Sequence, residues 1–270
     1  LSVVGLVGCA AARTPSTVRV ALLAPFEGRY REIGYNALYA ARLAQNDIGE
    51  DRVELLPIDD GGSIASATDR ARALALDPLV ISAMVIGPYT SDPSVQAAFG
   101  DVPMILVGNW GLNPTQENVF ALANPFLERQ LTISPTLDVT NAAAIENQLT
   151  GGDMLALEQF RLLRPTLDDV TILSVGELPS PDFIQRYKGS DPFAPEPGLL
   201  ATLTYDTTIL SIRAALESNG DRSTAHRFIQ QTDMTGLTGL IRFQDRLWVE
   251  AQVHAYRFDE TGQLIEIAFP

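Results

Sequence analysis

Predominantly apolar runs alternate with segments of helical spacing in the first part of the chain. The apolar runs are 18–24, 53–58, 80–86 and 103–107. A run without polar alternation is typical of a strand that is buried on both faces of a parallel sheet. Four such strand–helix repeats within about 90 residues predict a right-handed, doubly wound parallel α/β sheet.

The segment 18–34, VRVALLAPFEGRYREIG, holds the first strand and the turn after it. The apolar run ends at Pro25, and helical spacing is predicted to begin at Gly34. In open α/β sheets, ligands sit at turns of this kind because the following helix offers unpaired backbone N–H groups. We therefore expect this turn to face a ligand.

Polar residues that precede helical segments are the predicted N-caps. Ser63 is expected to cap a helix that runs to residue 76, Ser91 one over 94–99, and Ser223 one that ends near residue 231. Their side-chain oxygens accept hydrogen bonds from N–H groups that have no partner within the helix.

The remainder of the chain is less regular. Residues 118–135 are interpreted as a crossing segment, and a short strand is predicted over 170–175. Prolines between residues 179 and 197 mark irregular chain. A strong helix is predicted over 207–218, and strands with turns at 245–246 and 260–262 complete the chain.

The composition is typical of a soluble globular protein. Hydrophobic residues make up 46% of the 270 residues and charged residues 19%. No apolar run approaches the roughly 18 residues that span a bilayer, and the length allows one large domain or two modest ones. The formal net charge of −14 repels phosphate backbones, so we expect no nucleic-acid partner.

The sole cysteine, Cys9, follows an apolar N-terminal segment and precedes three alanines. Leu6-Val7-Gly8-Cys9 resembles the bacterial lipobox, in which a signal peptidase cuts before an acylated cysteine. The resemblance implies lipid attachment at Cys9, a signal remnant and tether over 1–17, and an extracytoplasmic, lipid-anchored location. The alternative is an apolar first strand with an inert, buried cysteine.

Several longer stretches resemble the type 1 periplasmic-binding fold, in particular the branched-chain-amino-acid-type solute-binding proteins of ABC transporters. VRVALLAPFEGRYREIGYNALYAARLAQNDI resembles the family's first strand, loop and helix, and VELLPIDDGGSIASATDRARAL its second unit. VISAMVIGPYTSDPSVQAAFGDVPMILVGNW resembles the third and fourth units. YDTTILSIRAAL and GLTGLIRFQDRLWVEAQVHAYRF resemble the C-terminal helix and hairpin.

The resemblance implies two lobes. Lobe 1 is expected over 18–124 with a returning segment at about 200–235, and a reduced α/β lobe 2 over 125–199, with the strands of 236–270 near the hinge. The family's second lobe normally has several strand–helix units, whereas this chain has only one confident strand there. Closure of the second lobe over a ligand is therefore in doubt.

The same resemblance implies a ligand site at the strand ends. In the family, hydroxyl and backbone N–H groups after the third and fourth strands hold the ligand's carboxylate, and the residue before the helix-opening glycine contacts its side chain. The residues that align with these positions, or flank them as an apolar wall or stacking ring, are Tyr30, Ile33, Tyr89, Thr90, Ser91, Asn109 and Trp110.

Each of these residues also has a purely structural interpretation. Ser91 can cap a helix, Trp110 can pack one lobe on the other, and Tyr30 and Ile33 can pack within their loop. Asp59 and Asp60 end a neighbouring strand, where acidic pairs more often cap the next helix. The family's second-lobe acidic residue, which holds the ligand's amino group, has no evident counterpart.

No enzyme motif competes with the binding interpretation. The chain has no G-x-S-x-G, G-x-x-x-x-G-K-[ST], H-E-x-x-H or G-x-G-x-x-G at the first turn. The two histidines, His226 and His254, fall on different predicted elements and are expected to be structural. We therefore expect neither a cofactor nor a metal site.

The leading hypothesis is a solute-binding protein that captures a small polar or amphipathic ligand, of amino acid, amide or carboxylate type, for an ABC permease. The expected partners are the ligand, the permease and a membrane through the lipid anchor. The alternative is a sensor or interaction module that has the same fold without the two-lobe trap. A third hypothesis, an α/β enzyme of flavodoxin or Rossmann type, predicts a bound cofactor.

Overall fold

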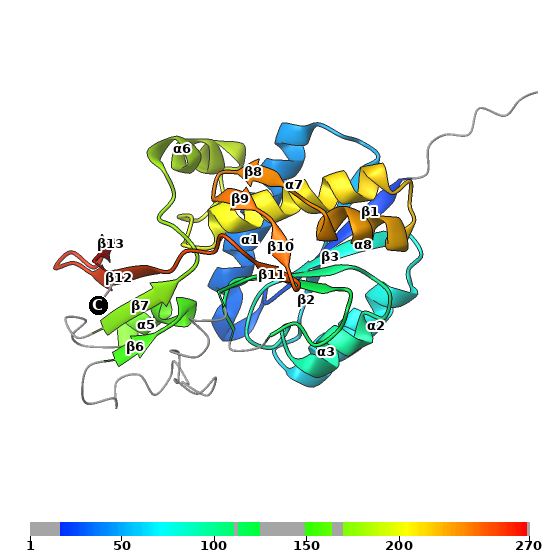
Figure 1. The fold of residues 1–270 in the computed structure, drawn as a ribbon. Coiled ribbons are helices and arrows are strands. Elements are labelled where there is room, and N and C mark those ends of the chain that lie inside the picture. Colours follow the sequence, from blue (N-terminus) through cyan, green and yellow to red (C-terminus); the bar gives the residue numbers. More distant parts are fainter. Residues whose placement is uncertain (1–16, 111–112, 125–148, 164–169, 269–270) are drawn as a thin grey trace, which may run out of the picture.

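The computed structural model describes residues 17–110, 113–124, 149–163 and 170–268 (Figure 1). Cys9 and the predicted tether lie outside the described residues, as does most of the predicted crossing segment 118–135. In the described part of the chain, no helix is both long and apolar enough to cross a membrane.

Among the residues that the structure describes, the larger of two main sheets has seven strands in the order β10-β11-β5-β4-β3-β1-β2. All neighbouring strands in it are parallel except β10 and β11. The bounds are β1 Val18–Ala24, β2 Val53–Asp59, β3 Val80–Val85, β4 Met104–Val107, β5 Val119–Leu122, β10 Phe243–Gln244 and β11 Leu247–Trp248. The predicted parallel α/β sheet is confirmed, because its central strands are buried on both faces.

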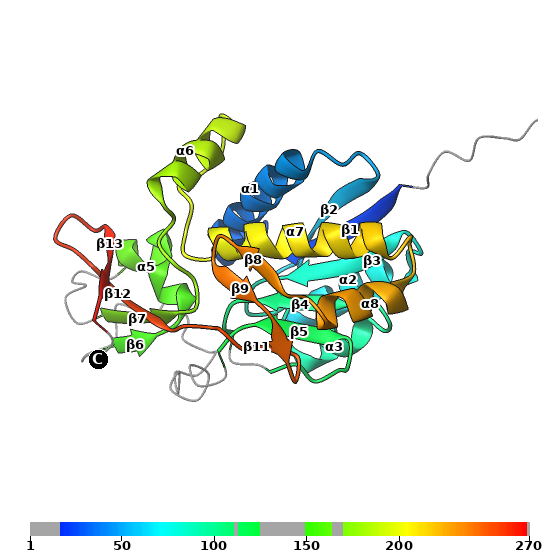
Figure 2. The ribbon, with the colours of Figure 1, turned by 45° about the horizontal axis from the view of Figure 1, so that its top comes forward.

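Helices cover both faces of this sheet (Figures 1 and 2). One face carries α1 (Arg31–Ile48), α7 (Ala201–Glu217) and α8 (Arg222–Gln230), and the other carries α2 (Ile64–Leu76) and α3 (Pro93–Ala98). Separate apolar clusters fill the two faces. The carboxyl ends of the parallel strands meet at one edge of the sheet, next to the start of α1.

The sequence pattern predicted that the first helix begins at Gly34, and this prediction is wrong. The helix begins at Arg31, directly after a 3-10 turn, η1 (Gly28–Tyr30). A Cβ atom on Gly34 would lie 2.0 Å from the carbonyl oxygen of Pro25. A glycine is therefore needed at this position, because the backbone of α1 packs directly against the backbone of the preceding loop and leaves no room for a side chain.

Two of the three predicted helix caps are wrong. Ser63 does cap α2, since its Oγ accepts the N–H of Ser66 at 3.2 Å. Asp92 rather than Ser91 caps α3, and Asp221 rather than Ser223 caps α8. In both errors an aspartate adjacent or close to the serine occupies the cap position, where its carboxylate also complements the helix dipole.

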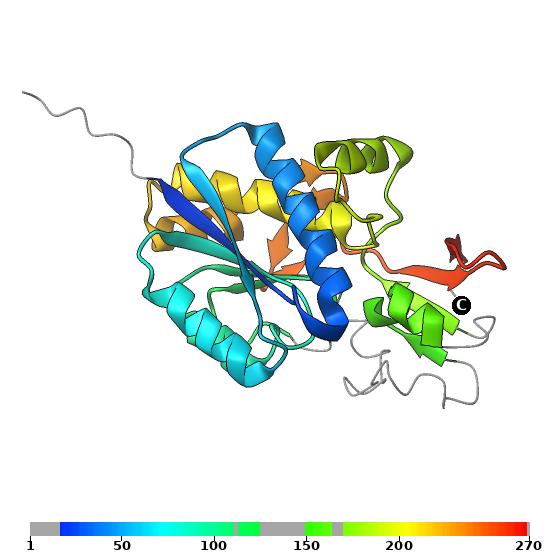
Figure 3. The same ribbon diagram turned by 180° about the vertical axis from the view of Figure 1, so that it is seen from behind.

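The smaller main sheet combines segments that are far apart in the sequence. Its order is β13-β12-β7-β6, with β6 Leu149–Gly151, β7 Val170–Ser174, β12 His254–Phe258 and β13 Leu264–Ile267. Two short helical elements, η3 (Asp153–Ala156) and α5 (Glu158–Leu163), follow β6. The strands predicted near the hinge thus contribute half of this sheet (Figure 3).

Residues 181–190, expected to be irregular because of their prolines, form a helix. Helix α6 (Pro181–Ser190) is capped by Ser180, whose Oγ accepts the N–H of Phe183 at 3.2 Å. Pro181 occupies the first helical position, where the missing N–H would have had no helical partner. A separate hairpin, β8 (Met234–Gly236) and β9 (Gly239–Ile241), lies against α7 through hydrogen bonds from its turn to Asp206.

Candidate functional site

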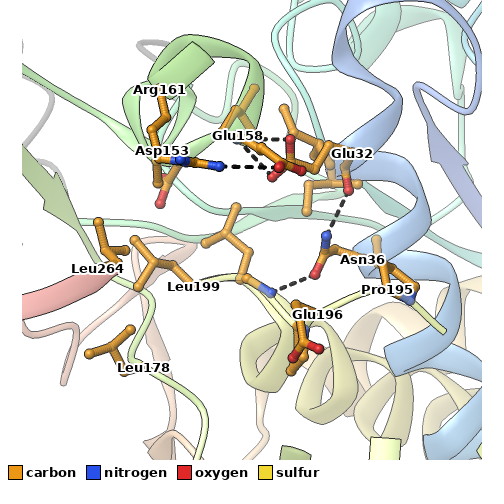
Figure 4. Close-up of a pocket in the computed structure, with 18 of the residues that line it drawn as sticks. Glu32, Asn36, Asp153, Glu158, Arg161, Leu178, Pro195, Glu196, Leu199 and Leu264 are labelled. Carbon is orange, nitrogen blue, oxygen red and sulfur yellow. Dashed lines mark hydrogen bonds and ion pairs between the residues drawn. The ribbon is translucent and has the colours of Figure 1, made fainter. Parts of the chain in front are cut away.

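A cavity of about 410 Å³ lies between the carboxyl edge of the large sheet and the small sheet (Figure 4). Its walls come from the start of α1, the chain after β3 and β4, the η3–α5 region, the 195–200 segment (PEPGLL), and β12 with β13. Cavities of a few hundred Å³ are typical of small-molecule sites. The two sheets therefore enclose a space of the size that a metabolite needs.

Helix α1 holds two other walls of this cavity in place. The carboxylate of Glu32 accepts the N–H of Glu158, at 3.1 and 3.0 Å to its two oxygens, and so caps α5 from across the cavity. The side chain of Asn36 donates to the carbonyl of Glu32 at 2.9 Å and accepts the N–H of Gly198. Burial raises the pKa of Glu32.

The 195–200 segment forms an apolar floor that runs over two glycines. A Cβ atom on Gly108, after β4, would lie 3.0 Å from the side chain of Leu200. A Cβ atom on Gly176, after β7, would lie 2.2 Å from the carbonyl oxygen of Leu199. Both leucines line the cavity, so the absence of side chains at the two strand ends allows the segment to join the two sheets.

Asp153 is the most deeply buried acidic group on the cavity wall. The residue is 6% exposed, and one of its carboxylate oxygens accepts a hydrogen bond from the hydroxyl of Ser174. The other oxygen, Oδ2, has no hydrogen-bond partner among the described residues. Burial raises the pKa of Asp153 to about 7, because the charged form loses its hydration.

The remaining charged groups on the wall lie nearer the solvent and have partners. Arg161 pairs with Glu158 at 3.3 Å, and the Glu158 side chain is 65% exposed. Glu196 pairs with Lys188 and is also largely exposed. Most of the remaining lining consists of apolar side chains, those of Ile33, Ile86, Trp110, Leu157, Leu178, Leu199, Leu200, Phe258 and Leu264.

Ile33 and Trp110 are the two predicted ligand contacts that line the cavity. The Trp110 indole is buried, and its Nε1 donates to the carbonyl of Val107 at 2.7 Å, so its ring edge is fixed by the strand that precedes it. Its apolar ring belongs to the same cluster as Leu200. The structure therefore places Trp110 both on the wall and in the packing between the sheets.

The other five predicted contacts lie at the same sheet edge but outside the described lining of the cavity. Tyr30 and Tyr89 pack edge to face, with ring centroids 5.8 Å apart. The hydroxyls of Thr90 and Ser91 donate to the carbonyl of Gly87 at 3.1 and 3.4 Å. Asn109 donates to the carbonyl of Asn124 and accepts its N–H, both at 3.0 Å. These donors thus stabilise the loops, and their role as ligand contacts stays a prediction.

Asp59 and Asp60 do not cap the next helix. Asp59 accepts the N–H groups of Phe26 and Glu27 at 2.8 and 3.0 Å and so ties the turn after β1 to the end of β2. Asp60 is fully buried and accepts the N–H of Gly62 at 2.7 Å. Within the described residues, no group of three or more His, Cys, Asp or Glu side chains is placed to hold a metal ion.

Comparisons with known proteins agree with this geometry. No protein-family model and no curated protein sequence matches the chain. The leucine-binding protein LivK from Thermotoga maritima aligns with 93% of this chain and 98% of its own, at TM-score 0.70 and 14% identity. The chain has the type 1 periplasmic-binding fold.

Two further structures of this fold were solved with ligands. The substrate-binding protein LivJ from Streptococcus pneumoniae, in complex with isoleucine, is 16% identical at TM-score 0.67, over 93% of this chain and all of that one. A solute-binding protein from R. palustris, in complex with benzoate, is 11% identical at TM-score 0.67, over 93% and 96%. The fold-level resemblance seen in the sequence is confirmed.

Removing the carboxylate of Glu32 tests the bridge between α1 and α5. Glu32→Ala is expected to lower the free energy of unfolding by about 1 kcal/mol, the usual cost of a lost N-cap. Glu32→Gln keeps an acceptor for the Glu158 N–H and should lose less. Urea denaturation of the two variants measures this, and equal losses would show that the cap contributes nothing.

Proposed function

We propose that this protein is a solute-binding protein that holds a small amphipathic ligand in the cavity between its two sheets and presents it to an ABC permease. The observation that carries the proposal is the cavity itself, whose largely apolar lining includes one buried carboxylate, that of Asp153, with an oxygen that has no hydrogen-bond partner among the described residues. Ligand sites typically have this character: mostly apolar, with a few placed polar groups.

The ligand class that we propose is an amino acid, an amide or a carboxylic acid of modest size. Structures of the same fold bind molecules of this size, since LivJ was solved with isoleucine and the R. palustris protein with benzoate. We place the protein outside the cytoplasm, anchored through a lipid on Cys9 of the lipobox-like segment.

The expected binding free energy requires that both sheets contact the ligand. Micromolar affinity corresponds to about −8 kcal/mol. Burying a side chain of leucine size supplies about 1.5–3 kcal/mol, and one charge-assisted hydrogen bond about as much. Since these terms sum to about 3–6 kcal/mol, the ligand must also gain from contacts made as the sheets close around it.

The second sheet favours this proposal over a single-lobe sensor or interaction module. Its strands β12 and β13, with η3 and α5 beside them, supply a large part of the cavity wall, including Phe258 and Asp153. A sensor or interaction module without a two-lobe binding site would not need a cavity between the two sheets.

Ligand-induced thermal shifts across amino acids, amides and carboxylic acids test the proposal. Binding to the native state alone raises the melting temperature, by an amount that grows with ligand concentration. Leu264→Trp, on the wall of the cavity, should abolish the shift by filling the space. Leu162→Trp makes the same change at a side chain that is 70% exposed, and should leave the shift intact. No shift with any compound, or equal shifts in both variants, would contradict the proposal.

A further inference from the structure

The charge on the cavity wall is predominantly negative. Among the described lining residues are four carboxylates, those of Glu32, Asp153, Glu158 and Glu196, against one guanidinium, that of Arg161. Three of the four have partners: Glu32 caps α5, Glu158 pairs with Arg161, and Glu196 pairs with Lys188. Asp153 differs from them because it is more than nine-tenths buried and its Oδ2 has no described partner.

No basic side chain among the described residues pairs with Asp153. Its described neighbours include Ser174 on β7, whose hydroxyl donates to it, and Tyr256 on β12, whose own hydroxyl donates to the carbonyl of Gly176 at 2.9 Å. A buried carboxylate without a counter-ion is costly, and a cation that enters the cavity would offset that cost. The wall thus provides an acceptor for a positive group.

The cavity offers little to a negative group. The hydroxyl and amide donors of Thr90, Ser91 and Asn109 are bound to backbone carbonyls and lie outside the described lining. Arg161 is the one cationic side chain on the described wall, and a ligand carboxylate there would have to compete with Glu158. The apolar remainder of the lining suits a hydrocarbon body.

We propose that the ligand is an organic cation, a small primary amine with an aliphatic or aromatic body, whose ammonium group pairs with Asp153 and which needs no carboxylate. This inference rests on the proposed solute-binding function and, for its ligand, favours an amine over the amino acids, amides and carboxylic acids named there. Ile33, Trp110, Leu200 and Leu264 would enclose the body, and the ammonium would donate to Oδ2 of Asp153.

Two matched series of compounds separate the two charges of an amino acid. Isopentylamine, leucinamide, leucine and isocaproate share one branched aliphatic body, and benzylamine and benzoate share an aromatic one. Dissociation constants are measured by calorimetry at pH 8, where Asp153 is ionised. The amines and leucinamide are expected to bind at least about 10-fold more tightly than the carboxylates, since the lone cationic side chain is already paired.

Asp153→Asn removes the charge while keeping the shape and the acceptor for Ser174. It should weaken amine binding by about 30-fold or more, the effect of truncating one partner of a buried charge pair. Glu196→Gln removes a charge from the same wall at an exposed, paired position and is expected to change affinity by less than about 3-fold.

The outcomes distinguish this inference from the function on which it rests. Tighter binding of leucine, isocaproate or benzoate than of the amines would overturn the inference and leave the solute-binding function standing. Equal amine affinity in Asp153→Asn and the native protein would overturn it as well. Failure of every compound in both series to bind would count against both.

Discussion

Replacing Asp153 by asparagine is expected to raise the free energy of unfolding at pH 8 by up to about 4 kcal/mol, and to leave it nearly unchanged at pH 4. The residue lies in the cavity wall, where one carboxylate oxygen accepts a hydrogen bond from Ser174 and the other has no partner in the described part of the chain. Above neutral pH the native state therefore buries an ion without a counter-ion, and asparagine removes that ion.

The sign follows from the direction of the pKa shift. Burial raises the pKa of Asp153 to about 7, from an ordinary 3.8. Between these two values the native state retains a proton that the unfolded state has released, so the free energy of unfolding falls as the pH rises through this window. Above pH 7 both states are ionised and the penalty stays constant.

Asp206 provides the matched control, because it is equally buried but fully partnered. Its carboxylate accepts the N–H of Leu237 at 3.0 Å, and the N–H and hydroxyl of Thr238 at 2.8 and 2.7 Å. Asp206→Asn turns an amide donor toward these donors and should destabilise the protein by about 1–3 kcal/mol at pH 8.

Urea denaturation of the native protein and both variants between pH 4 and 8 measures the difference. A stability gain in Asp153→Asn that is the same at pH 4 and pH 8 would contradict a burial-raised pKa. If Asp153→Asn is more stable at pH 8 and also loses amine binding, the Asp153 carboxylate lowers the stability of the protein and is at the same time needed for binding.

Gly34→Ala is expected to lower the free energy of unfolding by about 3 kcal/mol. The added methyl group would lie 2.0 Å from the oxygen and 2.6 Å from the carbon of the Pro25 carbonyl, and backbone atoms cannot rotate away as a side chain does. Helix α1 would have to move off the loop after β1. Since Glu32, Ile33 and Asn36 lie on the turns of α1 around Gly34, ligand binding should weaken as well.

Gly189→Ala makes the same change in a helix without the contact. Gly189 lies in α6, and nothing is within 4 Å of the position that its Cβ would occupy. There the substitution should be neutral or stabilise by up to about 1 kcal/mol, because alanine is the better helix former. Equal effects of the two substitutions in chemical denaturation would show that the close approach of α1 to Pro25 is not needed.

Sequence patterns predicted those structural features that depend only on neighbouring residues in the chain. Largely apolar runs predicted β1 to β4 to within about two residues at each end, because strands in the interior of a parallel sheet carry few polar side chains. The Asp245-Arg246 turn was also predicted, and both residues have the positive φ values, 49° and 69°, of a tight hairpin. Ile33 and Trp110 were predicted at strand ends that converge on one edge of the sheet, and both line the cavity there, while their role as ligand contacts stays a prediction.

Features that depend on distant partners were missed. The first turn of α1 was read as loop, because the contact of its Glu32 carboxylate is with a distant helix, α5, on the other side of the cavity. Helix α6 was missed because prolines were taken only as breakers, although Pro181 opens the helix. Asp153 follows a short strand and two glycines, a signal that could have been used, but the burial of its carboxylate depends on packing against Ser174.

The sequence by itself determined the parallel sheet, its strand ends and the resemblance to the type 1 periplasmic-binding fold, because these follow from burial periods and turn chemistry along a continuous chain. Only the tertiary structure decided the site. Glu32 meets Glu158 across 126 residues, and Asn36 meets Gly198 across 162. Such contacts do not appear as a periodic pattern in the sequence. The Asp153 carboxylate, one oxygen of which has no partner among the described residues, could therefore be recognised only once the two sheets were placed together.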